Sequence, residues 1–171
     1  TTGVFRSTVS PGKILTVTTD ANNRYSWVVH YPDGHEERFD HDGRIVQIVY
    51  PESIESSLTI DYVLPASSDT TVQDYWLPKS VSDGTGRTIY FQYDRTGDPA
   101  NPYVRLVRVY TIHADEGGYR DALLSLDYDA AGNLWKVKRK DQTVREYKYG
   151  ERDHFANPLL NLPHHLTGIV D

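Results

Sequence analysis

The chain has 171 residues, a formal net charge of −6, 38% hydrophobic residues, and neither cysteine nor methionine. This composition predicts one ordinary globular domain, or a piece of one, and excludes disulfides, thiol nucleophiles and zinc–thiolate sites. The acidic excess argues against a nucleic-acid partner, which would require a basic face. No apolar run approaches the roughly 18 residues of a membrane-spanning helix. The absence of an initiator methionine indicates an excerpt of a longer protein.

Strand-forming residues alternate along most of the chain, and no stretch shows helical periodicity. The alternating segments are 25–31, 58–62, 89–93 and 124–128. Turn-forming residues separate them at 32–34, 83–84, 116–118 and 140–142, and longer polar loops are expected at 65–74 and 94–103. Short turns between alternating segments are typical of hairpins. The predicted fold is therefore all-β, an antiparallel sheet of consecutive hairpins.

The pattern Asp-x-x-Gly occurs four times between predicted strands, at 40–43, 83–86, 94–97 and 129–132. An aspartate at the start of a tight turn accepts hydrogen bonds from nearby backbone N–H groups, and glycine supplies the positive φ that lets the chain enter the next strand. Both residues are therefore interpreted as structural. The aromatic residues before the aspartate (Phe39, Tyr93 and Tyr128) are expected to pack against neighbouring strands rather than bind a ligand.

These motifs, with Arg145-Glu-Tyr-Lys-Tyr149 and Leu166-Thr-Gly-Ile-Val-Asp171, make the chain similar to the YD-repeat (Rhs) family, which is named after the Tyr-Asp pair. The resemblance covers residues 27–171, with 1–26 as a leading strand segment, so that 1–171 is one fragment of the repeat region. It implies a strip of β-hairpins that spirals, in full-length relatives, into a hollow shell around a C-terminal toxin. It also implies a secreted or extracellular protein, delivered by a bacterial secretion system.

Several groups of residues invite a chemical interpretation. The seven histidines lack the spacing of a zinc site. The segment Asp40-His-Asp-Gly43 resembles the start of a calcium loop, but Pro51 stands where the bidentate glutamate would be required, so a turn is preferred. Glu36 and Glu37 alternate across a strand, which favours a solvated edge over a glycosidase pair. The sequence shows no nucleophile elbow. We predict no catalytic, cofactor or metal site and no enzymatic activity.

The basic run Lys136–Lys140 lies beside Trp135 and is the one local cationic and aromatic patch in the sequence. If it forms a hairpin, Lys136 and Lys138 share one face and Trp135, Val137 and Arg139 the other. A polar outer wall is the preferred interpretation, and binding of nucleic acid or an acidic glycan is the alternative. Stacked cross-strand rings likewise explain the 13 tyrosines better than a sugar-binding platform.

The sequence therefore predicts a structural role, as a section of the wall of an Rhs-type shell that encloses a toxin or effector. Its partners would be the flanking repeats and the enclosed effector. The alternative function is a β module that binds carbohydrate or a cell surface. Exposed sheet edges predict self-association, with residues 143–149 as the edge that pairs.

Overall fold

The computed structural model describes residues 2–6, 12–63, 77–96, 103–113, 119–151 and 162–171. Within these ranges the protein is all-β and its strands are antiparallel, which confirms the predicted fold class. A three-residue 3₁₀ turn, η1 (Ile54–Ser56), is the exception among the described elements. The strands are β1 (Thr2–Arg6), β2 (Ile14–Thr19), β3 (Tyr25–His30), β4 (Glu36–Phe39), β5 (Ile45–Val49), β6 (Leu58–Tyr62), β7 (Pro78–Asp83), β8 (Thr88–Thr96), β9 (Tyr103–His113), β10 (Tyr119–Tyr128), β11 (Leu134–Arg139), β12 (Val144–Tyr149) and β13 (Leu166–Val170).

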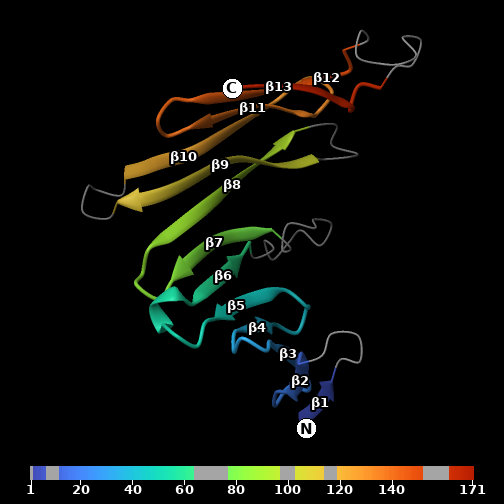
Figure 1. Ribbon diagram of the computed structural model, residues 1–171, viewed down its shortest axis with the longest axis vertical. Coiled ribbons are helices and arrows are strands. Elements are labelled where there is room, and N and C mark those ends of the chain that lie inside the picture. The colour runs from blue at the N-terminus through green and yellow to red at the C-terminus, as the bar shows by residue number, and fades with distance from the viewer. Residues whose placement is uncertain (1, 7–11, 64–76, 97–102, 114–118, 152–161) are drawn as a thin grey trace. The chain divides into compact units, whose positions relative to one another are not determined.

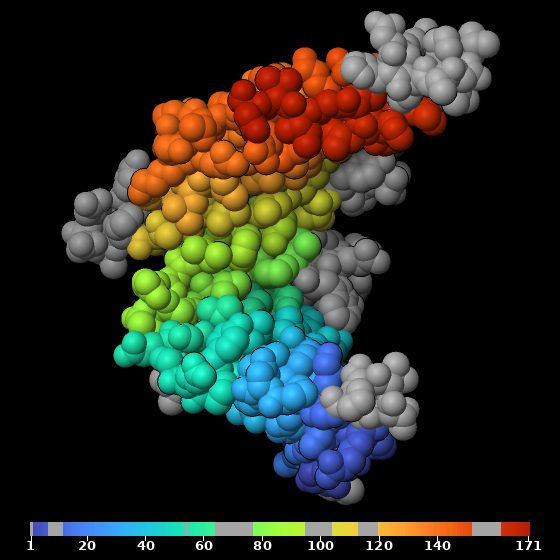
Figure 2. Space-filling view, viewed as in Figure 1, coloured from blue at the N-terminus to red at the C-terminus, as the bar shows by residue number. Residues whose placement is uncertain are grey.

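The strands form one sheet in which the order in space is the order in sequence, from β1 to β13 (Figure 1). Each strand between β1 and β13 pairs with the strands before and after it in the sequence, which is the arrangement of consecutive hairpins. The chain divides into two compact units, Thr1–Ile89 and Tyr90–Asp171. Within each unit the colour changes in successive bands, because sequence neighbours are also spatial neighbours (Figure 2).

In the first unit the strand register separates an apolar face from a polar face. Val17 on β2 lies opposite Trp27 on β3, which lies opposite Phe39 on β4. Residues directly opposite each other share a face, so these three side chains form an apolar row. One residue along, Val28 lies opposite Arg38, on the other face. The alternation read from the sequence at 25–31 therefore places one side of each strand in an apolar layer.

The second unit shows the same separation. Val109 on β9 lies opposite Leu124 on β10, and Leu126 lies opposite Val137 on β11. The opposite face carries Gln92, Arg108, Ser125 and Lys138, which form one row across four strands. Bulges in β8–β9 and β9–β10 keep these rows aligned although the strands contain unequal numbers of residues.

Burial in this sheet is shallow. The buried hydrophobic residues of the described ranges are Val109 and Tyr110, each 9% exposed, and no described side chain is less than 2% exposed. Most of the apolar row residues are half-buried. A typical domain packs the apolar face of a sheet against a second layer of structure. The described residues form a single layer.

The structure corrects two of the predictions. Asp94 lies inside β8, opposite Arg105, so the Asp-x-x-Gly copy at 94–97 does not begin a turn at its aspartate. The expected edge 143–149 is wrong, because β12 is covered on both sides by β11 and β13.

The turns at 32–34, 83–86 and 140–142 are confirmed. The expected turn at 116–118 and the expected loop at 65–74 lie outside the described residues. No described helix is long and apolar enough to cross a membrane.

The outer strands β1 and β13 carry exposed apolar side chains, including Phe5 at 58%, Ile169 at 54% and Val170 at 48%. An edge strand with such side chains is a template for pairing with another chain. We expect the 171-residue chain to form concentration-dependent oligomers, measurable by light scattering over a wide concentration range. Ile169→Lys should reduce this association, whereas Tyr25→Lys, which changes an exposed ring on the interior strand β3, should not. Monomeric protein at every concentration would contradict the expectation.

Candidate functional site

The three remaining Asp-x-x-Gly turns share one backbone geometry. In each, the amide of the aspartate donates to the carbonyl four residues later, as Asp40 N does to Arg44 O at 2.9 Å. The glycine amide donates back to the aspartate carbonyl, as Gly43 N does to Asp40 O at 3.0 Å. The glycines Gly43, Gly86 and Gly132 have φ values of 80°, 87° and 90°. This is a type I turn followed by a residue in the left-handed region, the usual hairpin with a bulge.

Three more hairpins use the same geometry without the Asp-x-x-Gly pattern. Asp20 N bonds Arg24 O at 2.9 Å, and the left-handed position is Asn23, with φ 62°. The turn 139–143 places Gln142 there, with φ 69°. The turn 31–35 uses Gly34, but its first residue is a tyrosine. Sequence reasoning missed the first of these because asparagine, which tolerates positive φ, replaces glycine.

The aspartate side chain closes each turn of the motif. One oxygen of Asp40 accepts from the amides of Asp42 and Arg44 at 3.0 Å each, and the other accepts from the Arg44 Nε at 2.7 Å. The same bonds recur at Asp20 with Arg24, at Asp83 with Arg87, and at Asp129 with Asn133. The residue after the glycine therefore matters, because its side chain binds the second carboxylate oxygen.

These hydrogen bonds favour the charged carboxylate. The hydrogen bond from the Thr85 hydroxyl is the largest cause that lowers the pKa of Asp83 to about 2; desolvation opposes it, and the Arg87 guanidinium and two backbone amides lower it further. Desolvation is the largest single effect on Asp40 and raises its pKa, but the bonds from Arg44 and from the Asp42 amide outweigh it, so the net shift is downward. The motif therefore depends on ionised aspartate.

Tyrosine rings tie the ends of neighbouring hairpins together. The Tyr62 hydroxyl on β6 donates to the carbonyl of Ile45 on β5 at 2.9 Å, and the Arg44 guanidinium lies 5.2 Å from the ring centre. In the second unit the Tyr128 hydroxyl donates to the Leu106 carbonyl at 2.9 Å, and Arg105 lies 5.2 Å from the ring. Burial raises the pKa of both tyrosines. Phe39, Tyr93 and Tyr128 are half-buried, which confirms their predicted packing role.

The histidines and acidic residues named in the sequence lie in separate local contacts. His30 bonds Thr16 through one ring nitrogen and Glu36 through the other, each at 3.0 Å. Glu37 points to the opposite face and accepts from the Tyr31 hydroxyl at 2.8 Å, which confirms the predicted alternation of the two glutamates. In the part of the chain that the structure describes, no three His, Asp or Glu side chains cluster closely enough to hold a metal ion.

Two lysines of the basic run 136–140 form ion pairs with acidic side chains. Lys136 forms an ion pair with Glu146 at 3.0 Å, and Lys140 pairs with Asp121. The strand register confirms the predicted faces of the paired residues of this run. Lys136 and Lys138 lie on one face of β11, and Val137 and Arg139 lie on the other. Trp135 is 45% exposed.

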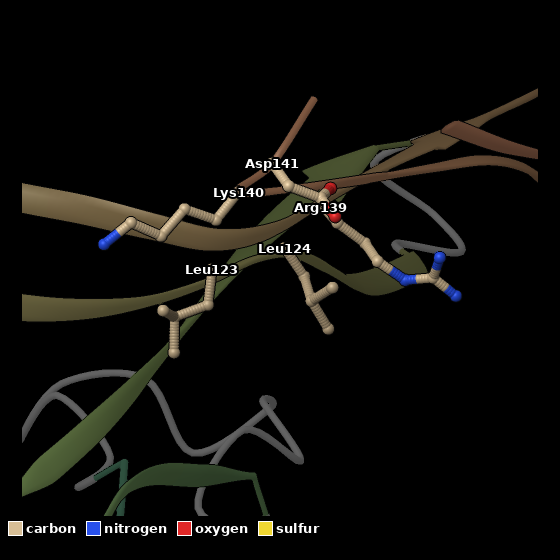
Figure 3. Close-up of a pocket in the computed structure, with 5 residues that line it drawn as sticks. All are labelled: Leu123, Leu124, Arg139, Lys140 and Asp141. Carbon is tan, nitrogen blue, oxygen red and sulfur yellow. The ribbon is translucent and has the colours of Figure 1, made fainter. Parts of the chain in front are cut away.

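A shallow groove of about 590 Å³ lies beside the β11–β12 turn, lined by Leu123, Leu124, Arg139, Lys140 and Asp141. The bulge in β10 places the side chains of Leu123 and Leu124 on the same side of the strand, and Arg139 and Lys140 extend away in opposite directions (Figure 3). The groove is mostly apolar and open to solvent, so it is not an enclosed reaction chamber.

No family model matches the chain, and a search of curated proteins finds no match to it. The functional interpretation therefore depends on the residues and geometry described above.

The turn geometry makes a specific prediction at Gly86, where a Cβ would meet no atom within 4 Å and φ is +87°. A substitution there would test backbone conformation without a steric clash. Gly86→Ala should lower the free energy of unfolding by about 1–2 kcal/mol, and Gly86→Asn by less, because Asn23 already occupies the equivalent position. Urea denaturation provides the measurement. Gly168→Ala serves as the control, since Gly168 lacks a positive φ. Equal stability of Gly86→Ala and the parent protein would disprove the turn assignment.

The low pKa of Asp83 predicts how stability changes with pH. The pKa is about 2 in the folded protein and about 3.9 for an unperturbed aspartate. The contribution of the carboxylate is therefore fully present above about pH 4 and is lost as the pH falls toward 2. Asp83→Asn should melt below the parent protein at pH 6, and the difference should shrink as the pH approaches 2. A difference that is independent of pH would show that the charge of Asp83 does not stabilise the turn.

Proposed function

We propose that this chain is a section of the wall of an Rhs-type hollow shell that encloses a C-terminal toxin or effector, and that it performs no catalysis itself. The observation that supports the proposal most strongly is the repeated hairpin turn. Each of these turns contains an aspartate, a residue in the left-handed region, and a following side chain that donates to the carboxylate. The turns begin at Asp20, Asp40, Asp83 and Asp129. A unit that repeats along a sheet in chain order is characteristic of repeat proteins, in which each unit contacts its neighbours.

The shallow burial supports the same role. The apolar rows at Trp27 and Leu124 are half-buried, and the described residues supply no second layer to cover them. An apolar face in a single-layer sheet needs a partner to exclude water. In a shell wall that partner is the enclosed chain or a facing part of the wall. The flanking repeats would extend the sheet beyond β1 and β13, and the protein would be secreted.

Exposed aromatic rings favour a second candidate, a module that binds carbohydrate or a cell surface. Trp135 is 45% exposed and Tyr25 is 53% exposed. Aromatic rings with one accessible face can stack on sugars. Under this alternative the isolated chain would bind neutral oligosaccharides, and Trp135→Ala would abolish that binding.

The test uses the product of the complete gene. Limited proteolysis, followed by mass spectrometry, should leave a C-terminal segment intact while the repeat region is native. Trp27→Glu, which places a charge in the apolar row, should make the C-terminal segment susceptible to the protease. Arg38→Glu, on the opposite face, should leave it resistant. A gene that ends at Asp171, or a C-terminal segment digested as fast as an unfolded chain, would contradict the shell. Ring-dependent binding on a neutral-glycan array would favour the second candidate.

A further inference from the structure

The polar face of the second unit carries a row of side chains rich in hydrogen-bond donors. The register places Gln92 on β8 opposite Arg108 on β9, Arg108 opposite Ser125 on β10, and Ser125 opposite Lys138 on β11. Gln92, Arg108 and Lys138 are exposed, and Ser125 is half-buried. Neighbouring strands lie about 4.8 Å apart, so the backbones of Arg108 and Lys138 are about 10 Å apart.

Among the described residues, the two cations of this row have no acidic partner. Other lysines of the unit do have one, since Lys136 pairs with Glu146 and Lys140 with Asp121. Within the described part of the chain, Arg108 and Lys138 form no ion pair and no side-chain hydrogen bond. The row therefore presents the guanidinium of Arg108, the ammonium of Lys138, an amide and a hydroxyl on one face. The N–H groups of the two cations are available to a ligand.

We propose that this row binds an acidic glycan, through sulfate or carboxylate groups spaced along an extended chain. Guanidinium and ammonium groups form charge-assisted hydrogen bonds with such groups, and Gln92, Arg108 and Lys138 are exposed to a linear polymer. Because the two cations stand on backbones about 10 Å apart, two acidic groups of one chain can be held at once. The proposal is independent of the enclosed effector and of the shell.

The aromatic residues beside the row argue against nucleic acid as the ligand. Tyr90 and Tyr110 stack on each other with their ring centres 5.4 Å apart, and the Arg120 guanidinium lies 5.3 Å from the Tyr110 ring. Tyr110 is only 9% exposed. Binding of single strands depends on exposed rings on which bases stack, and these rings already have partners.

The probes are fluorescently labelled oligosaccharides of heparin and of hyaluronan, of equal length, titrated into the 171-residue chain and followed by anisotropy at low ionic strength. The heparin probe presents sulfates and the hyaluronan probe carboxylates alone, so the pair identifies which group is recognised. At least one probe should bind, and its affinity should fall as salt is added.

Two neighbouring residues on opposite faces of β11 provide a matched pair of variants. Lys138→Glu should weaken binding roughly tenfold, and Arg108→Glu should do the same, because each reverses a charge in the row. Arg139→Glu makes the same charge change on the opposite face and should alter affinity less than twofold. Melting curves establish that the variants remain folded, and Lys138→Gln provides a milder substitution if Lys138→Glu does not fold.

Three results would overturn the proposal. The first is that neither probe binds at low ionic strength. The second is that Arg139→Glu weakens binding as much as Lys138→Glu, which would mean that the attraction is not local to the row. The third is that labelled duplex or single-stranded DNA binds more tightly than both glycans with the same dependence on Lys138, which would identify the row as a nucleic-acid site.

Discussion

The hydrogen bonds of an aspartate carboxylate hold four of the recurrent hairpin turns in shape. In the turn at Asp40, one oxygen holds two backbone amides and the other holds the side chain of Arg44. These bonds fix a left-handed residue at the third position after the aspartate, and with it the register of the next strand. Because a shift of one residue would turn the apolar face outward, the separation of the two faces depends on these turns.

That separation allows one sheet to carry both proposed roles. Each unit has its own apolar row, at Trp27 in the first and at Leu124 in the second, and the other face of the second unit carries the exposed Arg108 and Lys138. The apolar face requires a covering partner, which agrees with the proposed role as a wall. The polar face remains accessible in that arrangement. An enclosed partner on one side and an acidic glycan on the other are therefore compatible.

The strand segments marked by alternation and five of the six recurrent turns could be predicted from the sequence, because alternation and turn-forming residues act locally. The turn at Asn23 was missed, since its left-handed residue is not glycine. The copy at Asp94 was misassigned because the pattern is also compatible with a strand, and cross-strand pairing with Arg105 decided the outcome. Local sequence signals could not resolve that competition.

The tertiary contacts could not be predicted in the same way. The bond from Tyr128 to the Leu106 carbonyl joins residues 22 positions apart, and the row that contains Lys138 depends on bulges in two strand pairs. A bulge shifts every later pairing by one residue, and nothing in the sequence marks where these bulges lie. The family resemblance predicted hairpins, but not which residues would face each other across them.

The most direct test is amide hydrogen exchange, measured by NMR, at the residue that follows the left-handed position of each turn. In Arg24, Arg44, Arg87 and Asn133 this amide donates to the aspartate carboxylate. The account predicts that these four amides are protected to a similar degree as the neighbouring strands at neutral pH, and that Asp→Ala substitution in one turn removes protection there first. Exchange at the rate of an unstructured chain in the parent protein would contradict it.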